Sequence, residues 1–350
     1  MLITRIDIDN IDSKLLEEPA KIIREGGTVA FPTETVYGLG ANALMPYAVD
    51  NIFKAKGRPN DNPLIVHISD VSQVDGLVSE VPKKAKILME KFWPGPLTII
   101  MKKADVVPDN VTAGLETVGI RFPQNPVAKE FLRLAGVPVA APSANTSGRP
   151  SPTSVKHVIE DLYGKIDAVI DGGHSKFGLE STIIDMSGDL PTVLRPGSVT
   201  VEMLRDAIGE VSVDPAILHM PEEGMIAKAP GMKYKHYAPN VEVVVVKGKG
   251  EHVSMYINRC IEEKHKNGAK VGAMVYRQIL ADISGADVLR DLGDINHRST
   301  AAHSLFSILR MFETAGVSVV YAQDGGEGGL GLAISNRLNK AAGYKIVDLG

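Results

Sequence analysis

The first 208 residues alternate short apolar runs with amphipathic stretches, a pattern that predicts strands and helices in turn. So many short strands with intervening helices predict an α/β fold built on a large twisted mixed sheet. The helical patterns lie at 13–25, 50–56, 82–92, 126–134 and 153–162. The strand-like runs lie at 63–68, 97–102, 118–123, 137–142, 167–172 and 181–186, and the start of the chain also alternates like a strand.

The pattern changes at residue 212 and again at residue 241. Residues 212–240 contain four prolines and no sustained periodicity, so they are predicted to form a linker. Beyond it, four strand-like runs alternate with three helical patterns, which predicts a smaller three-layer Rossmann-like α/β domain. The predicted organisation is therefore a first domain at 1–211, a linker at 212–240 and a C-terminal domain at 241–350.

Length and composition narrow the class of protein. A chain of 350 residues is long for one core, in agreement with two domains. The single cysteine, Cys260, excludes an intramolecular disulfide and a multi-cysteine zinc site. The amino terminus lacks the apolar core of a signal peptide, and the run at 241–246 is far shorter than the roughly 20 residues of a membrane span. We therefore expect a cytoplasmic protein without membrane contact.

Two features invite a functional interpretation but favour a structural one. GGEGGLG at 325–331 follows a predicted strand and precedes a helix, yet it lacks the P-loop ending and the dinucleotide-binding spacing. We expect an ordinary strand-to-helix turn there. His297 and His303 are six residues apart, a spacing that does not place two ligands on one helix face. No metal site made of protein side chains is predicted.

Cations and neutral donors gather where the predicted strands of the first half end. The stretch FKAKGRPNDNPL at 53–64 carries several positive charges beside a proline-bounded loop. Each such residue alone could serve ordinary turn or capping chemistry. Together they favour an anionic ligand with phosphates and a carboxylate, because open α/β sheets place ligand sites at strand ends. The residues concerned are Lys56, Arg58, Arg121, Arg195, Ser143, Asn145 and Ser181.

Several motifs resemble those of one known family. KGR at 56–58 and SAN at 143–145 resemble the Lys-x-Arg and Ser-x-Asn pairs of the YrdC-like family. FPTETVYGLG, FWPGPLT, VGIRFP and GLESTIID resemble its other blocks in the same order. In the second half, GMKYKHYAP and GLGLAISNRLNKAA resemble the two-domain L-threonylcarbamoyladenylate synthases. The resemblance covers nearly the whole chain.

The resemblance implies an enzyme that combines L-threonine, bicarbonate and ATP, the last carrying Mg²⁺, into L-threonylcarbamoyl-AMP and pyrophosphate. A separate tRNA threonylcarbamoyltransferase would then modify the adenosine next to the anticodon. The catalytic residues implied by the motifs are Lys56, Arg58, Ser143 and Asn145. Those implied to bind ATP are Arg58, Asn62, Thr117, Ser143, Ser151 and Arg195. Those implied to surround threonine are Thr35, His67, Arg121, Ser181 and the backbone of Ala141.

Elementary chemistry agrees with these roles. The carbamate that attacks and the α-phosphate that it attacks are both anionic, so preorganised cations must offset the repulsion between them. We expect Lys56 and Arg58 to clamp the phosphates and Arg121 to anchor the threonine carboxylate. Because the intermediates are labile, closure that excludes water would help. We expect KYKHYAP at 233–239 to cap the pocket, with Tyr237 or Tyr234 reaching the nucleotide.

Three alternatives are weighed against this interpretation. A nucleic-acid-binding module would bind RNA in a salt-dependent way without turnover, but the net charge of −4 does not favour it. A carbamoyltransferase of the hydrogenase-maturation type carries cysteine-rich zinc modules, which one cysteine excludes. A purely partner-docking second domain is compatible with the synthase. The sequence leaves the oligomeric state and any weak direct binding of tRNA open.

Overall fold

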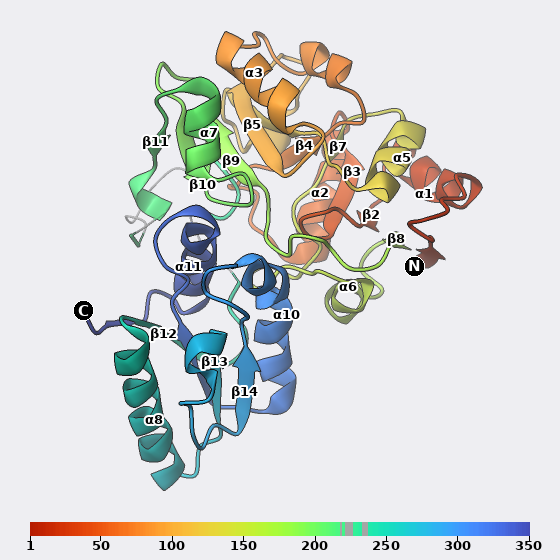
Figure 1. Ribbon diagram of the computed structural model, residues 1–350. Coiled ribbons are helices and arrows are strands. Elements are labelled where there is room, and N and C mark those ends of the chain that lie inside the picture. The colour runs from red at the N-terminus through yellow and green to blue at the C-terminus, as the bar shows by residue number, and fades with distance from the viewer. Residues whose placement is uncertain (218, 221–226, 233–236) are drawn as a thin grey trace. The chain divides into compact units, whose positions relative to one another are not determined.

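The computed structural model describes residues 1–217, 219–220, 227–232 and 237–350 (Figure 1). Its internal contacts divide the chain into two compact units. The first unit comprises residues 1–147 and 151–233, and the second comprises residues 148–150 and 234–350. The predicted linker is thus shared between the units, and its predicted limits at 212 and 240 stay a prediction. No helix in the described ranges is long and apolar enough to cross a membrane.

The first unit is built on one large mixed sheet, as predicted. Within the described ranges its strands follow the order β1-β8-β2-β3-β7-β4-β6-β5-β9-β10-β11. Parallel pairs such as β4 with β6 stand beside antiparallel pairs such as β5 with β6. The strands are β1 (Leu2–Arg5), β2 (Val29–Phe31), β3 (Gly38–Asn42), β4 (Ile65–His67), β5 (Leu97–Lys102), β6 (Thr117–Arg121), β7 (Val139–Ala140), β8 (Ala168–Asp171), β9 (Thr182–Asp185), β10 (Thr192–Arg195) and β11 (Ser212–Val213).

Amphipathic helices bury their apolar stripes against this sheet. In α1, Leu16, Ala20 and Ile23 recur at helical spacing and enter one core cluster with Phe31 of β2 and Phe131 of α5. The helices of the first unit are α1 (Lys14–Arg24), α2 (Pro46–Lys56), α3 (Lys83–Phe92), α4 (Asp109–Thr112), α5 (Pro126–Ala135), α6 (Val155–Leu162) and α7 (Val201–Ile208). Two 3₁₀ turns, η1 (Val71–Gly76) and η2 (Pro215–Ile217), complete it.

Strand β3 is an element that the apolar pattern does not predict. Its sequence, GLGAN, is dominated by small residues, yet it pairs with both β2 and β7. The glycines are required by close packing, because a Cβ on Gly40 would lie 2.7 Å from Cγ1 of Val139 and 3.0 Å from the Phe31 ring. Small residues here therefore let the ring of Phe31 approach the strand closely.

The second unit is a parallel sheet with helices, as predicted for the C-terminal domain. Its strands follow the order β14-β13-β15-β12-β16, and each neighbouring pair in this described sheet is parallel. They are β12 (Glu242–Lys247), β13 (Val271–Val275), β14 (Val288–Asp291), β15 (Val319–Gln323) and β16 (Ile346–Asp348). The helices are α8 (Gly250–Lys266), α9 (Arg277–Leu280), α10 (Ser299–Ala315) and α11 (Gly329–Ala341).

The glycine-rich loop at 325–331 connects β15 to α11, in agreement with a strand-to-helix turn. The guanidinium of Arg298 lies against its backbone. A Cβ on Gly326 would lie 2.9 Å from Nη2 of Arg298, and one on Gly331 would lie 3.2 Å from its Nε. The glycines therefore leave room for an arginine of the same unit.

Candidate active site in the first unit

Many of the predicted side chains share one face of the large sheet. His67 of β4 stands opposite Arg121 of β6. Because side chains alternate along a strand, Thr117, Gly119 and Arg121 point to the same side. Gly119 leaves space there, since a Cβ would lie 3.2 Å from Cγ2 of Thr98. The resulting hollow is lined by Pro63, Leu64, Ile65, Thr98, Ile100, Thr117, Gly119, Ile183, Lys228 and Pro230. The sheet is mixed, so its strands do not all end at one edge. The predicted residues are brought together by pointing to the same face of the sheet as well as by lying near strand ends.

Part of the predicted linker covers this face. Ala227, Ala229 and Met232 join one core cluster with Ile65, Ile100, Ile183 and Leu194 of the sheet. The carbonyl of Pro230 lies 3.4 Å from Nη1 of Arg195. Residues 227–232 therefore belong to the wall of the site. The predicted cap begins at residue 233, and its member Tyr234 lies outside the described residues.

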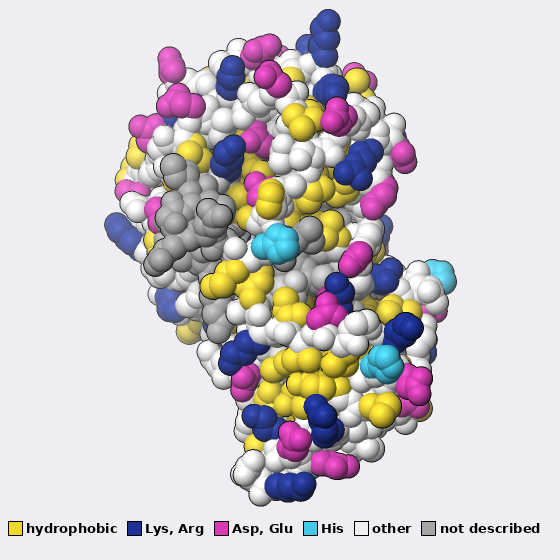
Figure 2. All heavy atoms as spheres, turned by 90° about the vertical axis from the view of Figure 1, so that its left-hand side faces the viewer, with side chains coloured by type: hydrophobic (Ala, Val, Ile, Leu, Met, Phe, Trp, Pro, Cys, Tyr) yellow, Lys and Arg dark blue, Asp and Glu magenta, His cyan; other side chains and the backbone are white. Residues whose placement is uncertain are grey.

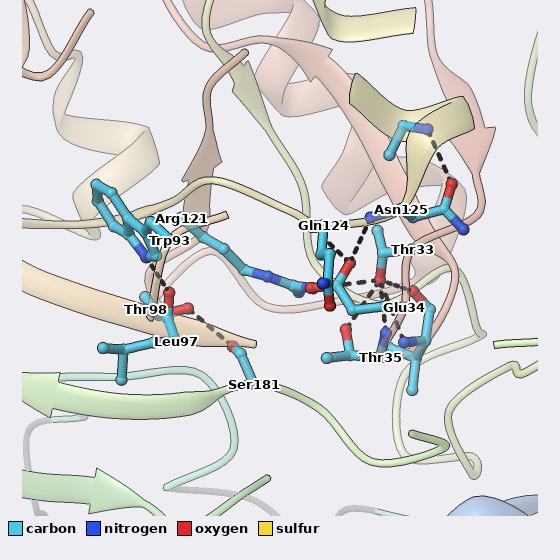
Figure 3. A network of polar contacts seen from close by, with 12 residues as sticks. Thr33, Glu34, Thr35, Trp93, Leu97, Thr98, Arg121, Gln124, Asn125 and Ser181 are labelled. Carbon is cyan, nitrogen blue, oxygen red and sulfur yellow. Dashed lines mark hydrogen bonds and ion pairs between the residues drawn. The ribbon is translucent and has the colours of Figure 1, made fainter. Parts of the chain in front are cut away.

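A buried ion pair joins Arg121 to Glu34. Nη2 of Arg121 donates to Oε1 of Glu34 at 2.7 Å, and both side chains are about 95% buried (5% and 4% exposed). The second oxygen of Glu34 accepts the backbone N–H groups of Gln124 and Asn125 at 3.0 and 3.1 Å (Figure 3). Glu34 thereby satisfies the need for an anionic partner that the sequence indicated for Arg121. Nε of Arg121 has no hydrogen-bond partner among the described residues.

Two threonines beside Glu34 form a compact hydroxyl pair. Oγ1 of Thr33 lies 2.8 Å from Oγ1 of Thr35 and 2.6 Å from the carbonyl of Val36, to which it donates (Figure 3). The backbone N–H of Thr35 also points at the Thr33 hydroxyl, at 3.2 Å. Thr33 therefore fixes the turn that presents Thr35, the predicted threonine contact, beside the ion pair.

His67 is buried between this cluster and the core. Its Nδ1 lies 3.2 Å from the carbonyl of Ile65, and its ring meets Phe31 edge-on at 5.9 Å. Burial, followed by the charge of Arg121, lowers the pKa of His67 to about 3. The imidazole is therefore neutral at physiological pH and presents a hydrogen-bonding group rather than a cation.

This neutral histidine should make stability depend on pH. In the unfolded chain His67 has its ordinary pKa of 6.5 and binds a proton below that pH. In the folded chain it stays neutral until about pH 3. The free energy of unfolding should therefore fall by about 1.4 kcal/mol per pH unit as pH drops through this window. Urea titrations at pH 7, 6 and 5 should show a flatter slope for His67→Gln. The control is His174→Gln at an exposed position. Equal slopes for wild type and His67→Gln would contradict the assignment.

Lys56 connects α2 to the SAN loop. Its side chain is 2% exposed, and Nζ donates to the carbonyls of Ser143 and Asn145, each at 2.5 Å. The backbone carbonyl of Lys56 accepts the N–H of Ser147 at 2.9 Å. In the same loop the Ser143 hydroxyl donates to Oδ1 of Asn145 at 2.5 Å. The KGR and SAN motifs are thus physically one structure, braced by the lysine.

The neighbouring predicted ATP residues are ordered by similar contacts. Nη2 of Arg58 donates to the carbonyls of Asn62 and Pro63 at 3.1 and 3.2 Å. Oδ1 of Asn62 is buried and has no partner in the described part of the chain. The Ser151 hydroxyl donates to Oε1 of buried Glu180 at 2.5 Å. Arg58 is therefore held by its own loop, and Ser151 by a carboxylate.

Ser181 and Arg195 form a further polar group. Oγ of Ser181 lies 2.8 Å from Oγ1 of Thr98 on β5 (Figure 3). Arg195 of β10 donates from Nε to the Ser181 carbonyl at 3.0 Å and from Nη2 to its hydroxyl at 3.1 Å. The structure thus places a residue predicted for ATP directly against one predicted for threonine.

Two other predicted contacts are constrained differently. The N–H of Ala141 donates to the carbonyl of Ile65 at 2.8 Å, so its carbonyl is the group left for a ligand. Tyr237 lies in the second unit, where its ring stacks on Phe306 at 5.2 Å and faces Arg337 at 5.8 Å. Tyr237 is therefore not among the predicted residues that the first unit brings together.

The sequence interpretation assigned no role to three polar side chains of this site. Glu34 pairs with Arg121, Glu180 holds Ser151, and Thr98 holds Ser181. The first could have been found, because FPTET places a carboxylate immediately after a buried strand and Arg121 required one. The other two partners lie 29 and 83 residues from the serines that they contact, and no local pattern marks such pairs.

Comparison with known proteins places the chain in a family. The family profile named Sua5, YciO and YrdC, described as "Telomere recombination", matches residues 21–197. A second, "Threonylcarbamoyl-AMP synthase, C-terminal domain", matches residues 199–343. Threonylcarbamoyl-AMP synthase of Pyrococcus abyssi is 47% identical over 97% of this chain and 98% of its own length. That of Bacillus subtilis is 44% identical over 95% and 94%.

A solved structure supports the same family assignment. The crystal structure of Pyrococcus abyssi Sua5 complexed with L-threonine superposes with a TM-score of 0.94 at 45% identity, covering 100% of both chains. The fold and its two units thus define a two-domain enzyme of the YrdC-like class. The chain belongs to the threonylcarbamoyl-AMP synthase family that carries the additional C-terminal domain. The predicted family, fold class and enzyme class are confirmed.

Proposed function

We propose that this chain condenses L-threonine, bicarbonate and ATP into L-threonylcarbamoyl-AMP and pyrophosphate. The observation that carries the proposal is the buried group formed by Arg121, Glu34 and neutral His67 on one sheet face. With the neighbouring hydroxyls of Thr33 and Thr35 it offers one guanidinium and several uncharged polar groups, which suits a small zwitterion with a hydroxyl. The threonine complex of the Pyrococcus abyssi relative supports this choice of amino acid.

Arg121 receives the threonine carboxylate in this proposal. Its Nη2 is engaged by Glu34, whereas its Nε is buried without a partner among the described residues, so a ligand oxygen would satisfy that donor. Thr35 and Ser181 supply hydroxyls, and the Ala141 carbonyl supplies an acceptor for the amine. Neutral His67 can accept or donate a hydrogen bond without repelling the ammonium group.

The ATP subsite is proposed to comprise Arg58, Asn62, Thr117, Ser143, Ser151 and Arg195. Lys56 keeps its predicted place beside the phosphates, and the structure supports a second role, in which its ammonium fixes the loop that presents Ser143. Among the described residues no group of three or more His, Cys, Asp or Glu side chains could hold a metal ion. Mg²⁺ would therefore arrive on the ATP phosphates as part of the substrate. Tyr237 as a nucleotide contact stays a prediction.

These residues would act by positioning and by electrostatics. The threonine amine attacks bicarbonate to give a carbamate with loss of water, and a carbamate oxygen then attacks the α-phosphorus. The bond to the β-phosphate oxygen breaks, and pyrophosphate leaves. Fixed cations and donors stabilise the charge that develops on the leaving group, and binding in line supplies the entropic advantage. No covalent enzyme intermediate is required.

Transfer to tRNA by a separate enzyme completes the proposed role. Direct strong binding of RNA by this chain is the competing proposal. Figure 2 shows Lys and Arg side chains interspersed with Asp and Glu over the face that it presents. Such mixing, with a net charge of −4, favours a small-molecule enzyme over a nucleic-acid-binding module.

The proposal is tested by pyrophosphate release from ATP, with threonine or bicarbonate omitted in turn. We expect release to require both. Release without threonine would show that the site serves another acceptor. No release in any mixture, together with tight salt-dependent RNA binding, would overturn the proposal in favour of the binding module.

A further inference from the structure

Three residues of the SAN loop belong to the second unit. Residues 148–150 cluster with 234–350, whereas residues before 148 and after 150 belong to the first unit. They lie between Ser143 and Ser151, both proposed to contact ATP. The loop of the ATP subsite is therefore interrupted by a segment that the C-terminal domain holds.

Helix α10 holds this segment through one face. Arg310 is 4% exposed and donates from Nε and Nη2 to the carbonyl of Pro150 at 3.2 and 2.6 Å. One turn further, Glu313, whose side chain is 10% exposed, forms an ion pair with the partly exposed Arg149. Residues at this spacing lie side by side on a helix. The helix thus fixes both polar ends of the Arg149-Pro150 dipeptide.

The same face also holds the end of the predicted linker. Oε1 of Glu313 accepts the N–H of Asn240 at 2.7 Å, while the N–H of Ala238 donates to the carbonyl of Gly148 at 2.9 Å. Phe306, one turn before Arg310, stacks on Tyr237. Loop and linker are therefore joined to each other and to a single helix.

We propose that Arg310 and Glu313 are positioning residues for ATP binding. They act through the chain by fixing residues 148–150 and hence the setting of Ser143 and Ser151. This inference rests on the proposed function only in taking those serines as ATP contacts. The inference gives the C-terminal domain a defined role in the reaction. By fixing residues 148–150, it preorganises the loop that carries Ser143 and Ser151 for ATP binding.

The test is Arg149→Met, because this side chain is partly exposed and its loss leaves no large cavity. We expect the KM and the Kd for ATP to rise about fivefold to twentyfold, with kcat within about twofold and the KM for threonine unchanged. Glu313→Gln should act in the same direction. The double variant should be no worse than the stronger single variant, since either change breaks the same ion pair. Arg310→Lys, which retains the charge, should give a smaller effect of the same kind.

Lys156→Met is the matched control, since Lys156 forms an exposed pair with Glu160 in α6 of the first unit. It should leave ATP binding unchanged. A lowered Tm for Arg149→Met with unaltered ATP binding would overturn the inference and leave a merely structural contact. Calorimetric binding of ATP decides this point without turnover, so a wild-type protein that bound ATP but formed no product would refute the proposed function alone.

Discussion

Replacing Lys56 with methionine is expected to reduce kcat/KM for ATP by at least about a hundredfold, which corresponds to about 2.7 kcal/mol of transition-state stabilisation. Methionine keeps most of the side-chain volume but leaves the carbonyls of Ser143 and Asn145 without the donor that now contacts both. A buried acceptor without a partner destabilises by about 1–3 kcal/mol, so the loop should shift to find another. Pyrophosphate release and urea unfolding measure the two effects.

Lys54→Met provides the control for this variant. Lys54 lies in the same helix, two residues earlier, and is exposed. Its replacement should change neither activity nor the urea midpoint measurably. A Lys56→Met enzyme with normal kcat/KM would show that the brace is dispensable and that the phosphates are held elsewhere.

Replacing Arg121 with methionine is expected to abolish measurable threonine binding and to lower the free energy of unfolding by about 3–5 kcal/mol. The loss of stability arises because Glu34 would then be a buried carboxylate whose remaining donors, among the described residues, are the backbone N–H groups of Gln124 and Asn125. The double variant Glu34→Gln/Arg121→Met should recover much of the stability, since no unpaired charge is left. It should not recover threonine binding, which calorimetry can measure directly.

Arg133→Met reports on an ordinary ion pair for comparison. Arg133 is 63% exposed and pairs with Glu130. Exposed pairs contribute about 0–1 kcal/mol, so this variant should stay close to wild type in stability and in threonine affinity. Threonine binding by the double variant at wild-type strength would refute the role proposed for Arg121.

The elements that the sequence predicted well are those whose burial leaves a local pattern. Strands β5 and β6 are apolar runs buried in a sheet, and α1 shows an apolar stripe at helical spacing. Strand β3 was not predicted, because its glycines give no apolar signal in the sequence, although tight packing against Phe31 requires them. Strand β14 (VLRD) escaped because it is half exposed at the end of the sheet order.

The same difference between local patterns and long-range partners applies to the site. Motif order identified the KGR and SAN segments, yet only the fold revealed that Lys56 bonds the backbone of the SAN loop. Likewise, the isolated Arg121 indicated an anion, but the sequence could not tell a ligand from Glu34, which lies 87 residues away. Local patterns record burial and turn chemistry, whereas long-range partners depend on topology.

The path of the chain restricts how such a protein can gain or lose its second domain. Residues 148–150 pass into the second unit and return before the chain crosses again near residue 233. A cut at the linker would therefore separate α10 from a segment that it holds, without removing that segment from the first fragment. A form of this chain without the C-terminal domain would therefore lack the contacts that α10 makes to residues 148–150, so removing the domain changes the chain at two places that are distant in sequence.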